Sequence, residues 1–454
     1  MLAAIKDFLL RERTIGNRPL PSPKRRKRNR QRGIALVAVM IAIAVTLAIT
    51  NEFGTSTNID MMAAANYRDQ MRSHFLARSA ASMAELVIRV QQRLDNVKQL
   101  AGLGIRVTDF ADQILLAFCG NPEEVQAAIG LSSANTKGLG ADIGTCGITG
   151  PITTDDDKIN LNCGNASSQT VLLSELTALM QFPAYDPVFE DPDADGYRRD
   201  RQTQATAIID YLDTDTTVVG QRGVSESYGY ENLKDFYKPK NNYLDTIGEA
   251  KLIRGVDDRF WTLFGSAFTV YGGCKINVAS LSNVQLIAAV LQLTAANPQD
   301  PVVQDPIKLF QLANLVAKAK EFGENFTATK DFVAFVKDPT SSLGSLASQT
   351  GSLAGSAASS AVNSGAVGAM TNGQKLGLEL KQASVDQILS GGARRTYRVE
   401  AWGEIDRKQR MADGSPVFPA IRTTITGVWD TKVVPQNVRK PPAPKGAWVF
   451  MRED

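Results

Sequence analysis

The chain has 454 residues, which is enough for two or three domains. Its formal net charge is only +3, and much of that excess lies in one basic block near the N-terminus, so the rest of the chain is close to neutral and has no general basic surface for nucleic acid. A single apolar stretch is long enough to cross a membrane, which excludes a protein with several spans.

The apolar stretch follows the basic block directly. Seven of the nine residues 24–32 are Lys or Arg, and an apolar run without any acidic residue extends from Ile34 to about Thr50. A basic flank beside an uncharged helix former is typical of a membrane helix whose N-terminal flank is cytoplasmic. We therefore expect one transmembrane helix over residues 34–52.

Gly33 stands between the charges and the apolar run. An ordinary secretory signal has its small-residue cleavage site after the apolar core, whereas here the small residue precedes it. The junction resembles the type III signal of type IV pilins and type II secretion pseudopilins. That resemblance implies that residues 1–33 are a cytoplasmic leader, and that a prepilin peptidase cuts between Gly33 and Ile34, with methylation as part of the processing. The alternative is a plain signal anchor that is never cut.

Counted from Ile34, the fifth residue is Ala38, where most pilins carry Glu. A carboxylate inside an apolar filament core needs a cationic partner, and in pilins the partner is the amine of the neighbouring subunit above. A subunit with nothing above it has no partner to offer, so Ala38 indicates a position at the tip. Within type II secretion, the K-type minor pseudopilin typically departs from the glutamate rule and is the largest of its set.

One long helix is expected over residues 34–100, because no proline occurs between Pro23 and Pro122 and two glycines, Gly102 and Gly104, then end it. His74, the only histidine in the chain, lies on this helix with no acid or nucleophile placed to act with it, so we expect no catalytic role for it. An apolar stripe at helical spacing predicts the buried face of the helix, and it consists of Leu76, Ala80, Met83, Val87, Val90, Leu94 and Val97.

Residues 101–163 are expected to form short strands and turns, the first part of an α/β domain. They hold Cys119, Cys146 and Cys163, and Cys274 is the fourth cysteine. Beyond the membrane these residues can form disulfides, and four cysteines allow three pairings among which the sequence does not choose. Proximity favours Cys146–Cys163, which leaves Cys119–Cys274. A zinc site is the alternative, but there is no Cys-x-x-Cys and no nearby histidine.

Helical patterns dominate residues 164–338, and the best candidate for chemistry lies among them. Asp191, Asp193 and Asp195 occupy alternate positions before Gly196, which is the first half of an EF-hand-type calcium loop. The match is partial, because Gln202 stands where such a loop has its bidentate glutamate.

A second acidic cluster follows, with Asp210, Asp213, Asp215 and then Glu226. It resembles the K-type pattern of Asp-Trp-Ile-Asp-x-Asp followed by Gly-Ala-Glu, with Tyr211 in place of the tryptophan. Oxygen ligands without His or Cys favour calcium over zinc or copper. The alternatives are a solvated acidic loop with a helix cap, or a glycosidase carboxylate pair, for which no aromatic-lined sugar cleft is evident. The resemblance implies calcium bound by Asp191, Asp193, Asp195, Asp213, Asp215 and Glu226.

Composition changes sharply after the helical region. Residues 339–374 are almost entirely Ser, Gly, Ala and Thr, which is typical of a flexible linker. Residues 375–454 then return to alternating patterns, and we expect strands over 395–407, 420–429 and 446–451 that form an antiparallel sheet with one covered face.

Several weaker motifs occur in the order found in K-type pseudopilins. They are Ile159-Asn-Leu-Asn162 after an acidic turn, the helix near Glu249 with Gly255 behind it, Ile276-Asn-Val278, and Tyr397-Arg-Val-Glu400. The chain from Gly33 to its end is similar to the general secretion pathway protein K family in this order. The resemblance implies an α+β fold, in which a long N-terminal helix packs on an antiparallel sheet in the pilin-like manner and a large all-α domain is inserted.

The function implied by the resemblance is assembly rather than catalysis. The chain would be a minor pseudopilin, anchored in the inner membrane with its globular part in the periplasm, that primes and caps the type II secretion pseudopilus. Its partners would be minor pseudopilins of the I and J types and the prepilin peptidase, with no nucleic acid. The alternatives are a minor pilin of a type IV pilus and a membrane-anchored periplasmic enzyme.

Overall fold

The computed structural model describes residues 32–95, 106–119, 144–164, 168–192, 200–221, 223–227, 230, 237–321, 324, 326–339, 376–406, 419–433 and 446–454. The chain divides into two compact units, Met1–Tyr67 and Arg68–Asp454. Of the predicted segments, nearly all of the leader and of the Ser/Gly/Ala-rich linker lies outside the described residues, as do residues 96–100 of the long helix and the glycines expected to end it.

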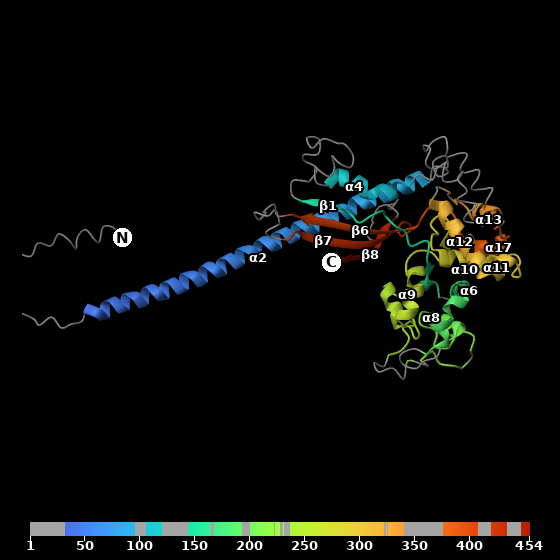
Figure 1. Cartoon of the computed structure of the whole chain (residues 1–454), viewed down its shortest axis with the longest axis horizontal. Helices are drawn as coiled ribbons and strands as arrows, with labels where there is room; N and C mark the ends of the chain where they lie inside the picture. Colours follow the sequence, from blue (N-terminus) through green and yellow to red (C-terminus); the bar gives the residue numbers. More distant parts are fainter. Residues whose placement is uncertain are drawn as a thin grey trace, which may run out of the picture. The chain divides into compact units, whose positions relative to one another are not determined.

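Helix α2, Arg32–Asp95, is a single long helix (Figure 1). It contributes residues to both units. Its apolar run contains Thr46 and Thr50, whose hydroxyls donate to the carbonyls of Ala42 and Thr46 at 2.9 and 2.8 Å. These side chains therefore satisfy their polar atoms within the helix itself, which suits a segment without water around it. The prediction of one long helix is confirmed over the described residues.

The main sheet has four antiparallel strands in the order β1-β6-β7-β8. Their bounds are Thr145–Ile148, Thr396–Ile405, Ile421–Asp430 and Ala447–Glu453. Tyr397, Val399, Ala401 and Gly403 alternate along β6, and the first three are at most 3% exposed. The predicted C-terminal strands and their single covered face are thus present in the structure, because period-2 patterning placed them correctly.

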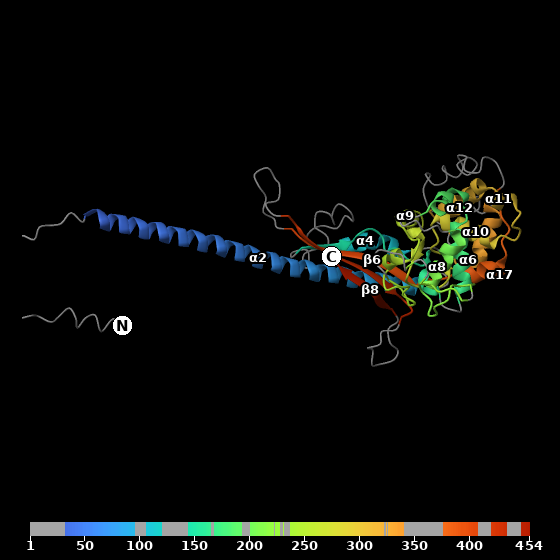
Figure 2. The same ribbon diagram turned by 90° about the horizontal axis from the view of Figure 1, so that it is seen from below.

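The C-terminal half of α2 packs on this covered face (Figure 2). The predicted stripe is partly wrong, since Val90 is 42% exposed. The buried line instead runs through small side chains: Ser73, Ala77, Ala80, Ala81 and Ala84, followed by Val87, Ile88 and Gln91. Sequence spacing favoured the large residues, but a close approach of helix to sheet selects small ones.

Gly403 marks the closest point of that approach. A Cβ atom there would meet main-chain atoms of Ser73 and Ala77 on α2, and the Ser73 hydroxyl donates to the Gly403 carbonyl at 2.7 Å. Gly403→Ala is therefore expected to lower the free energy of unfolding by about 2–3 kcal/mol, because the helix must move off the sheet. Urea unfolding measures this, and Gly248→Ala, whose added Cβ would meet only the Thr246 hydroxyl at 3.9 Å, is the matched control. Equal losses in both variants would contradict the close-packing argument.

Between α2 and β1 the chain forms a short 3₁₀ turn, η1, Val107–Phe110, and helix α4, Ala111–Cys119. The helix was not predicted, since strands and turns were expected in this region. Leu115 and Cys119 are buried against α2 and the sheet, and Cys119 is bonded to Cys146 of β1.

The second disulfide joins Cys163 to Cys274. The predicted pairing of Cys146 with Cys163 is therefore wrong. Cys146 belongs to the core between the sheet and α2, whereas Cys163 ends the 3₁₀ turn Leu161–Cys163, which contacts the helix Gln169–Met180. Proximity in sequence therefore did not correspond to proximity in space.

The acidic turn before Cys163 joins the insert to the sheet. Asp155 accepts from Arg398 of β6 at 2.6 Å and from Lys158 at 2.7 Å. Asp156 accepts from the Thr396 hydroxyl at 2.6 Å. Two buried carboxylates thus bind the first strand residues of β6, which fixes where the insert leaves the sheet.

The insert contains a body of helices (Figure 2) and two short parallel strand pairs. β2, Ile159–Asn160, pairs with β3, Phe268–Thr269, and β4, Ile276–Asn277, pairs with β5, Leu389–Ser390. The 3₁₀ turns are η2, Leu161–Cys163; η3, Pro183–Tyr185; η4, Ile247–Leu252; and η5, Gly265–Ala267. The α-helices are α6, Gln169–Met180; α7, Asp186–Glu190; α8, Arg201–Asp210; α9, Asp258–Phe264; α10, Val284–Thr294; α11, Pro301–Gln304; α12, Pro306–Glu321; α13, Thr329–Lys337; and α17, Gln382–Ile388.

One hydrophobic core runs through these helices and is separate from the core between α2 and the sheet. α10 lies at its centre, with seven of its eleven residues buried. Val385 and Ile388 of α17 join the same core, although α17 follows the linker in sequence. The α+β fold, with a long helix on an antiparallel sheet and an inserted helical part, is confirmed, although the insert is not all-α because it contains the pairs β2–β3 and β4–β5.

Candidate metal centre

Three carboxylates gather after α8, where the second acidic cluster was predicted. Asp200 caps the start of this helix by accepting from the Thr203 amide at 2.7 Å, and Asp210 is its last residue. The chain then turns through Asp213 and folds back, since the Val218 amide donates to the Val224 carbonyl and the Glu226 amide to the Thr216 carbonyl. This return brings Glu226 beside the end of the helix.

Asp210, Asp213 and Glu226 each place a carboxylate oxygen within 4.8 Å of the others, and all three are buried. Each accepts one hydrogen bond from a neutral donor: Asp210 from the Val219 amide at 2.8 Å, Asp213 from Gln169 Nε2 at 3.1 Å, and Glu226 from Asn241 Nδ2 at 2.9 Å. Across the described part of the chain, no Lys or Arg forms an ion pair with any of the three.

Two oxygens of this group are buried without a hydrogen-bond partner among the described residues, namely Asp213 Oδ1 and Glu226 Oε1. Burial removes water from the carboxylates and the neighbouring carboxylates repel one another. Together these effects raise the pKa of Asp210 to about 7, of Asp213 to about 6 and of Glu226 to about 7. A concentration of buried negative charge without a counter-charge is the environment that a bound cation would relieve.

Asn241 is a further member of the centre that the sequence did not reveal. Its side-chain nitrogen donates to Glu226 and to the Asp215 carbonyl, its amide donates to the Tyr211 carbonyl at 3.0 Å, and its Oδ1 is buried without a partner in the described structure. Its φ of 47° is the left-handed conformation, which asparagine tolerates better than most residues. A lone Asn about fifteen residues beyond Glu226 has no motif that would have pointed to it.

The predicted ligands divide into three groups. Asp213 and Glu226 come together, and Asp210, which the sequence placed in the acidic cluster but not among the ligands, joins them. Asp215 is exposed and is not one of the three carboxylates, but its side chain forms a hydrogen bond with that of Glu226. Its Oδ1 also accepts from the amide and hydroxyl of Thr217, both at 2.8 Å. Asp191 is exposed after α7, and Asp193 and Asp195 lie outside the described residues.

The donor set fits a hard divalent cation. It offers carboxylate oxygens, and Asp213 Oδ1 and Glu226 Oε1 have no hydrogen-bond partner among the described residues. Calcium takes six to eight oxygens and tolerates irregular geometry, whereas zinc and copper prefer nitrogen and sulfur ligands. Calcium therefore matches these residues better than a transition metal does.

The residues of the predicted cleavage site stand at the start of α2. Ile34 is 70% exposed, and Ala38 lies one turn further along the same helix. Within the described residues, the helix Gly33–Asp95 is the one long and apolar enough to cross a membrane, and its most apolar 18-residue window has a mean hydropathy of 2.6 with none of it buried. The helix is therefore a candidate membrane anchor.

His74 lies on the half of α2 that packs against the sheet. Its Nδ1 contacts Oε1 of Glu453 at the end of β8, and its ring meets Phe75 edge-on. The contact ties the last strand to the helix, which is a structural role.

No protein-family model matches the chain, and no curated protein does so either. Among solved structures, the chain is similar to one chain in the crystal structure of the GspK–GspI–GspJ complex from the type 2 secretion system of enterotoxigenic Escherichia coli. The sequence identity is 13% and the TM-score 0.43, and the match covers 87% of this chain and 99% of that chain.

Proposed function

We propose that this chain is a K-type minor pseudopilin that primes and caps the tip of a type II secretion pseudopilus. The observation that carries the proposal is the junction at Gly33: a basic block, a glycine and an uncharged run that continues without a break into a helix packed on a sheet. A cleaved secretory signal would not remain part of the folded domain, whereas a pilin-type anchor does.

In this role the apolar half of α2 first holds the protein in the inner membrane, with the remaining chain in the periplasm. After cleavage the same segment packs against the helices of partner minor pseudopilins of the I and J types. Ala38 places no carboxylate in that apolar core, so the subunit needs no amine above it. The bulk of the helical insert would hinder addition of another subunit above this one. In this proposal the insert acts by its shape and not by catalysis.

Calcium is part of the proposal. Asp210, Asp213 and Glu226 would hold it, with Asn241 orienting Glu226 through its side-chain nitrogen. Asp191, Asp193, Asp195 and Asp215 remain candidates for further ligands or a second ion. The ion would supply the positive charge that the buried carboxylates lack, and so fix the loop 213–226 against α8.

The N-terminal sequence of the membrane-extracted protein tests the proposal. In cells with an active prepilin peptidase, the mature chain is expected to begin at Ile34, and in cells without it the leader is expected to remain. Gly33→Leu is expected to block cleavage, since the peptidase site needs a small residue, while Gly54→Ala in the same helix serves as the control. An uncut leader in cells with active peptidase would refute the pseudopilin role.

A minor pilin of a type IV pilus shares this cleavage, so a second measurement separates the two systems. Deletion of the gene is expected to stop export of proteins across the outer membrane while leaving surface pili in place. Loss of pili with normal export would assign the chain to a type IV pilus instead.

A further inference from the structure

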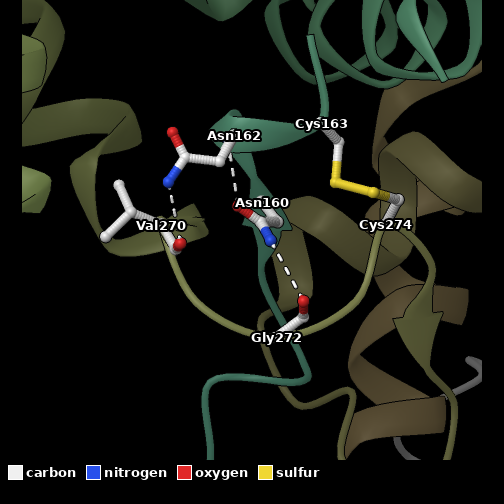
Figure 3. Close-up of a disulfide and its surroundings, with 6 residues drawn as sticks. All are labelled: Asn160, Asn162, Cys163, Val270, Gly272 and Cys274. Carbon is white, nitrogen blue, oxygen red and sulfur yellow. Dashed lines mark hydrogen bonds between the residues drawn. A yellow bond between two sulfur atoms is a disulfide. The ribbon is translucent and has the colours of Figure 1, made fainter. Parts of the chain in front are cut away.

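The disulfide Cys163–Cys274 closes the part of the insert that contains the candidate metal centre. The two cysteines are 111 residues apart in sequence, and all four residues of the centre lie between them. Figure 3 shows the bond beside η2. The parallel pair β2–β3 joins the same two ends through main-chain hydrogen bonds.

Asn162 precedes Cys163 directly, and its side chain contacts Val270 near the other end of the segment and Leu244 within it. Its Nδ2 donates to the carbonyls of Leu244 and Val270, both at 3.0 Å, and its Oδ1 accepts from the Leu244 amide at 2.8 Å (Figure 3 shows the bond to Val270). Asn160 orients this region by accepting from the Asn162 amide at 3.0 Å and donating to the Gly272 carbonyl at 3.4 Å (Figure 3). Three hydrogen bonds of its side-chain amide thus hold Asn162 in one position.

Leu244 lies three residues beyond Asn241 of the metal centre. The segment between them is held at one end by Asn241, which bonds Glu226 and the Tyr211 carbonyl, and at the other end by Asn162. Leu244 is also 3% exposed in the core of the insert. A short path therefore joins the disulfide to the metal centre. Cys163 directly follows Asn162, which is hydrogen-bonded to Leu244; three residues before Leu244, Asn241 is hydrogen-bonded to Glu226.

We propose that Asn162 and the Cys163–Cys274 disulfide position the metal-binding loop, so that closing the disulfide tightens calcium binding and bound calcium favours the closed disulfide. This inference rests on the calcium binding proposed above. Asn162 acts here as a positioning residue, since its side chain forms hydrogen bonds to main-chain atoms of Leu244 and Val270 and not to the three carboxylates.

The physical basis is preorganisation. Calcium has to hold the carboxylates of Asp210, Asp213 and Glu226 around one point. A disulfide that already joins the two ends of the segment between Cys163 and Cys274 reduces the entropy lost on binding. Because coupling between two equilibria is reciprocal, calcium must shift the disulfide equilibrium by the same factor. Opening the bond takes two electrons and two protons from two glutathione molecules, giving two thiols and one glutathione disulfide, so a glutathione buffer sets the position of that equilibrium.

The first experiment measures the calcium dissociation constant of the full chain in detergent by titration calorimetry. The paired change Cys163→Ser with Cys274→Ser is expected to raise the constant about tenfold, as is Asn162→Ala. The matched controls are Cys119→Ser with Cys146→Ser, which removes the disulfide beside α2, and Asn314→Ala, which removes an exposed asparagine of α12. Neither control is expected to change the constant by more than about twofold.

The second readout is the redox equilibrium of the wild-type chain. In a fixed glutathione buffer, alkylation and mass spectrometry of the Cys163 and Cys274 peptides are expected to show less reduced protein with calcium than without. Asn162→Ala, which keeps the disulfide, is expected to remove that difference. This variant also tests the coupling should the cysteine variant fail to fold.

Two results overturn the inference in distinguishable ways. Equal calcium affinity in the oxidised wild type, the cysteine variant and Asn162→Ala would show that the centre forms independently of the disulfide. Absence of calcium binding in the oxidised wild type would reject the metal centre itself, and this inference with it.

Discussion

Calcium is expected to raise the free energy of unfolding of the full chain by about 2.7 kcal/mol when its concentration is a hundred times its dissociation constant. Asp213→Asn is expected to abolish this effect, because it removes a buried carboxylate with an oxygen that no described residue binds. The same variant should be more stable than wild type without calcium, by about 1–3 kcal/mol, since it relieves the repulsion that raises the pKa of its neighbours. Urea unfolding with calcium and with a chelator measures both effects.

The pH dependence of this prediction has a defined sign. The metal-free folded state keeps protons on Asp210 and Glu226 up to about pH 7, whereas the unfolded chain releases them near their ordinary values. The folded state therefore binds more protons over that window, and metal-free stability falls as pH rises through it. Calcium displaces those protons, so its affinity is expected to fall as pH drops below about 7.

The control for the calcium experiment is Asp258→Asn, which changes a carboxylate whose side chain is 96% exposed on α9. It should keep the full response to calcium. A calcium response that survives in Asp213→Asn would show that the ion binds elsewhere, for example at the loop 191–195.

Periodicity carried most of the fold prediction. The strands β6, β7 and β8 lie within about two residues of the predicted bounds, because alternation is a local property of the sequence. The buried face of α2 was harder to predict. Ser73 and Ala77 make a close contact with Gly403, and only the facing strand explains why small residues are buried there while Val90 is exposed.

In the metal centre, too, some residues could be predicted from the local sequence and others depend on the fold. Asp213 and Glu226 stand in an acidic pattern that can be read along the chain, but Asp210 and Asn241 join them only because of how α8 ends and how the loop returns. The disulfides follow this rule as well. Cys163 and Cys274 meet because β2 pairs with β3 in parallel, which is a contact between distant segments that sequence spacing does not encode.

Glu175→Gln is expected to stabilise the chain by about 3 kcal/mol near pH 7. Glu175 lies on α6 at 5% exposure, its Oε1 is buried without a partner in the described structure, and burial raises its pKa to about 8. Between its ordinary pKa of 4.5 and about 8, the folded chain holds a proton that the unfolded chain releases. Wild-type stability therefore falls as pH rises through this window, and the glutamine variant lacks that loss because its amide does not ionise.

The difference in free energy of unfolding between Glu175→Gln and the wild type is thus expected to grow with pH. It should be small near pH 4.5 and reach its maximum near pH 8, where the wild-type carboxylate is charged even when folded. Urea unfolding across this range measures it, with Glu190→Gln on the exposed surface of α7 as the control that stays flat. A pH-independent difference, or a loss of stability in Glu175→Gln at the alkaline end, would mean that a cation or an ordered donor compensates this buried carboxylate. The ionised Glu175 would then stabilise the folded insert and not destabilise it.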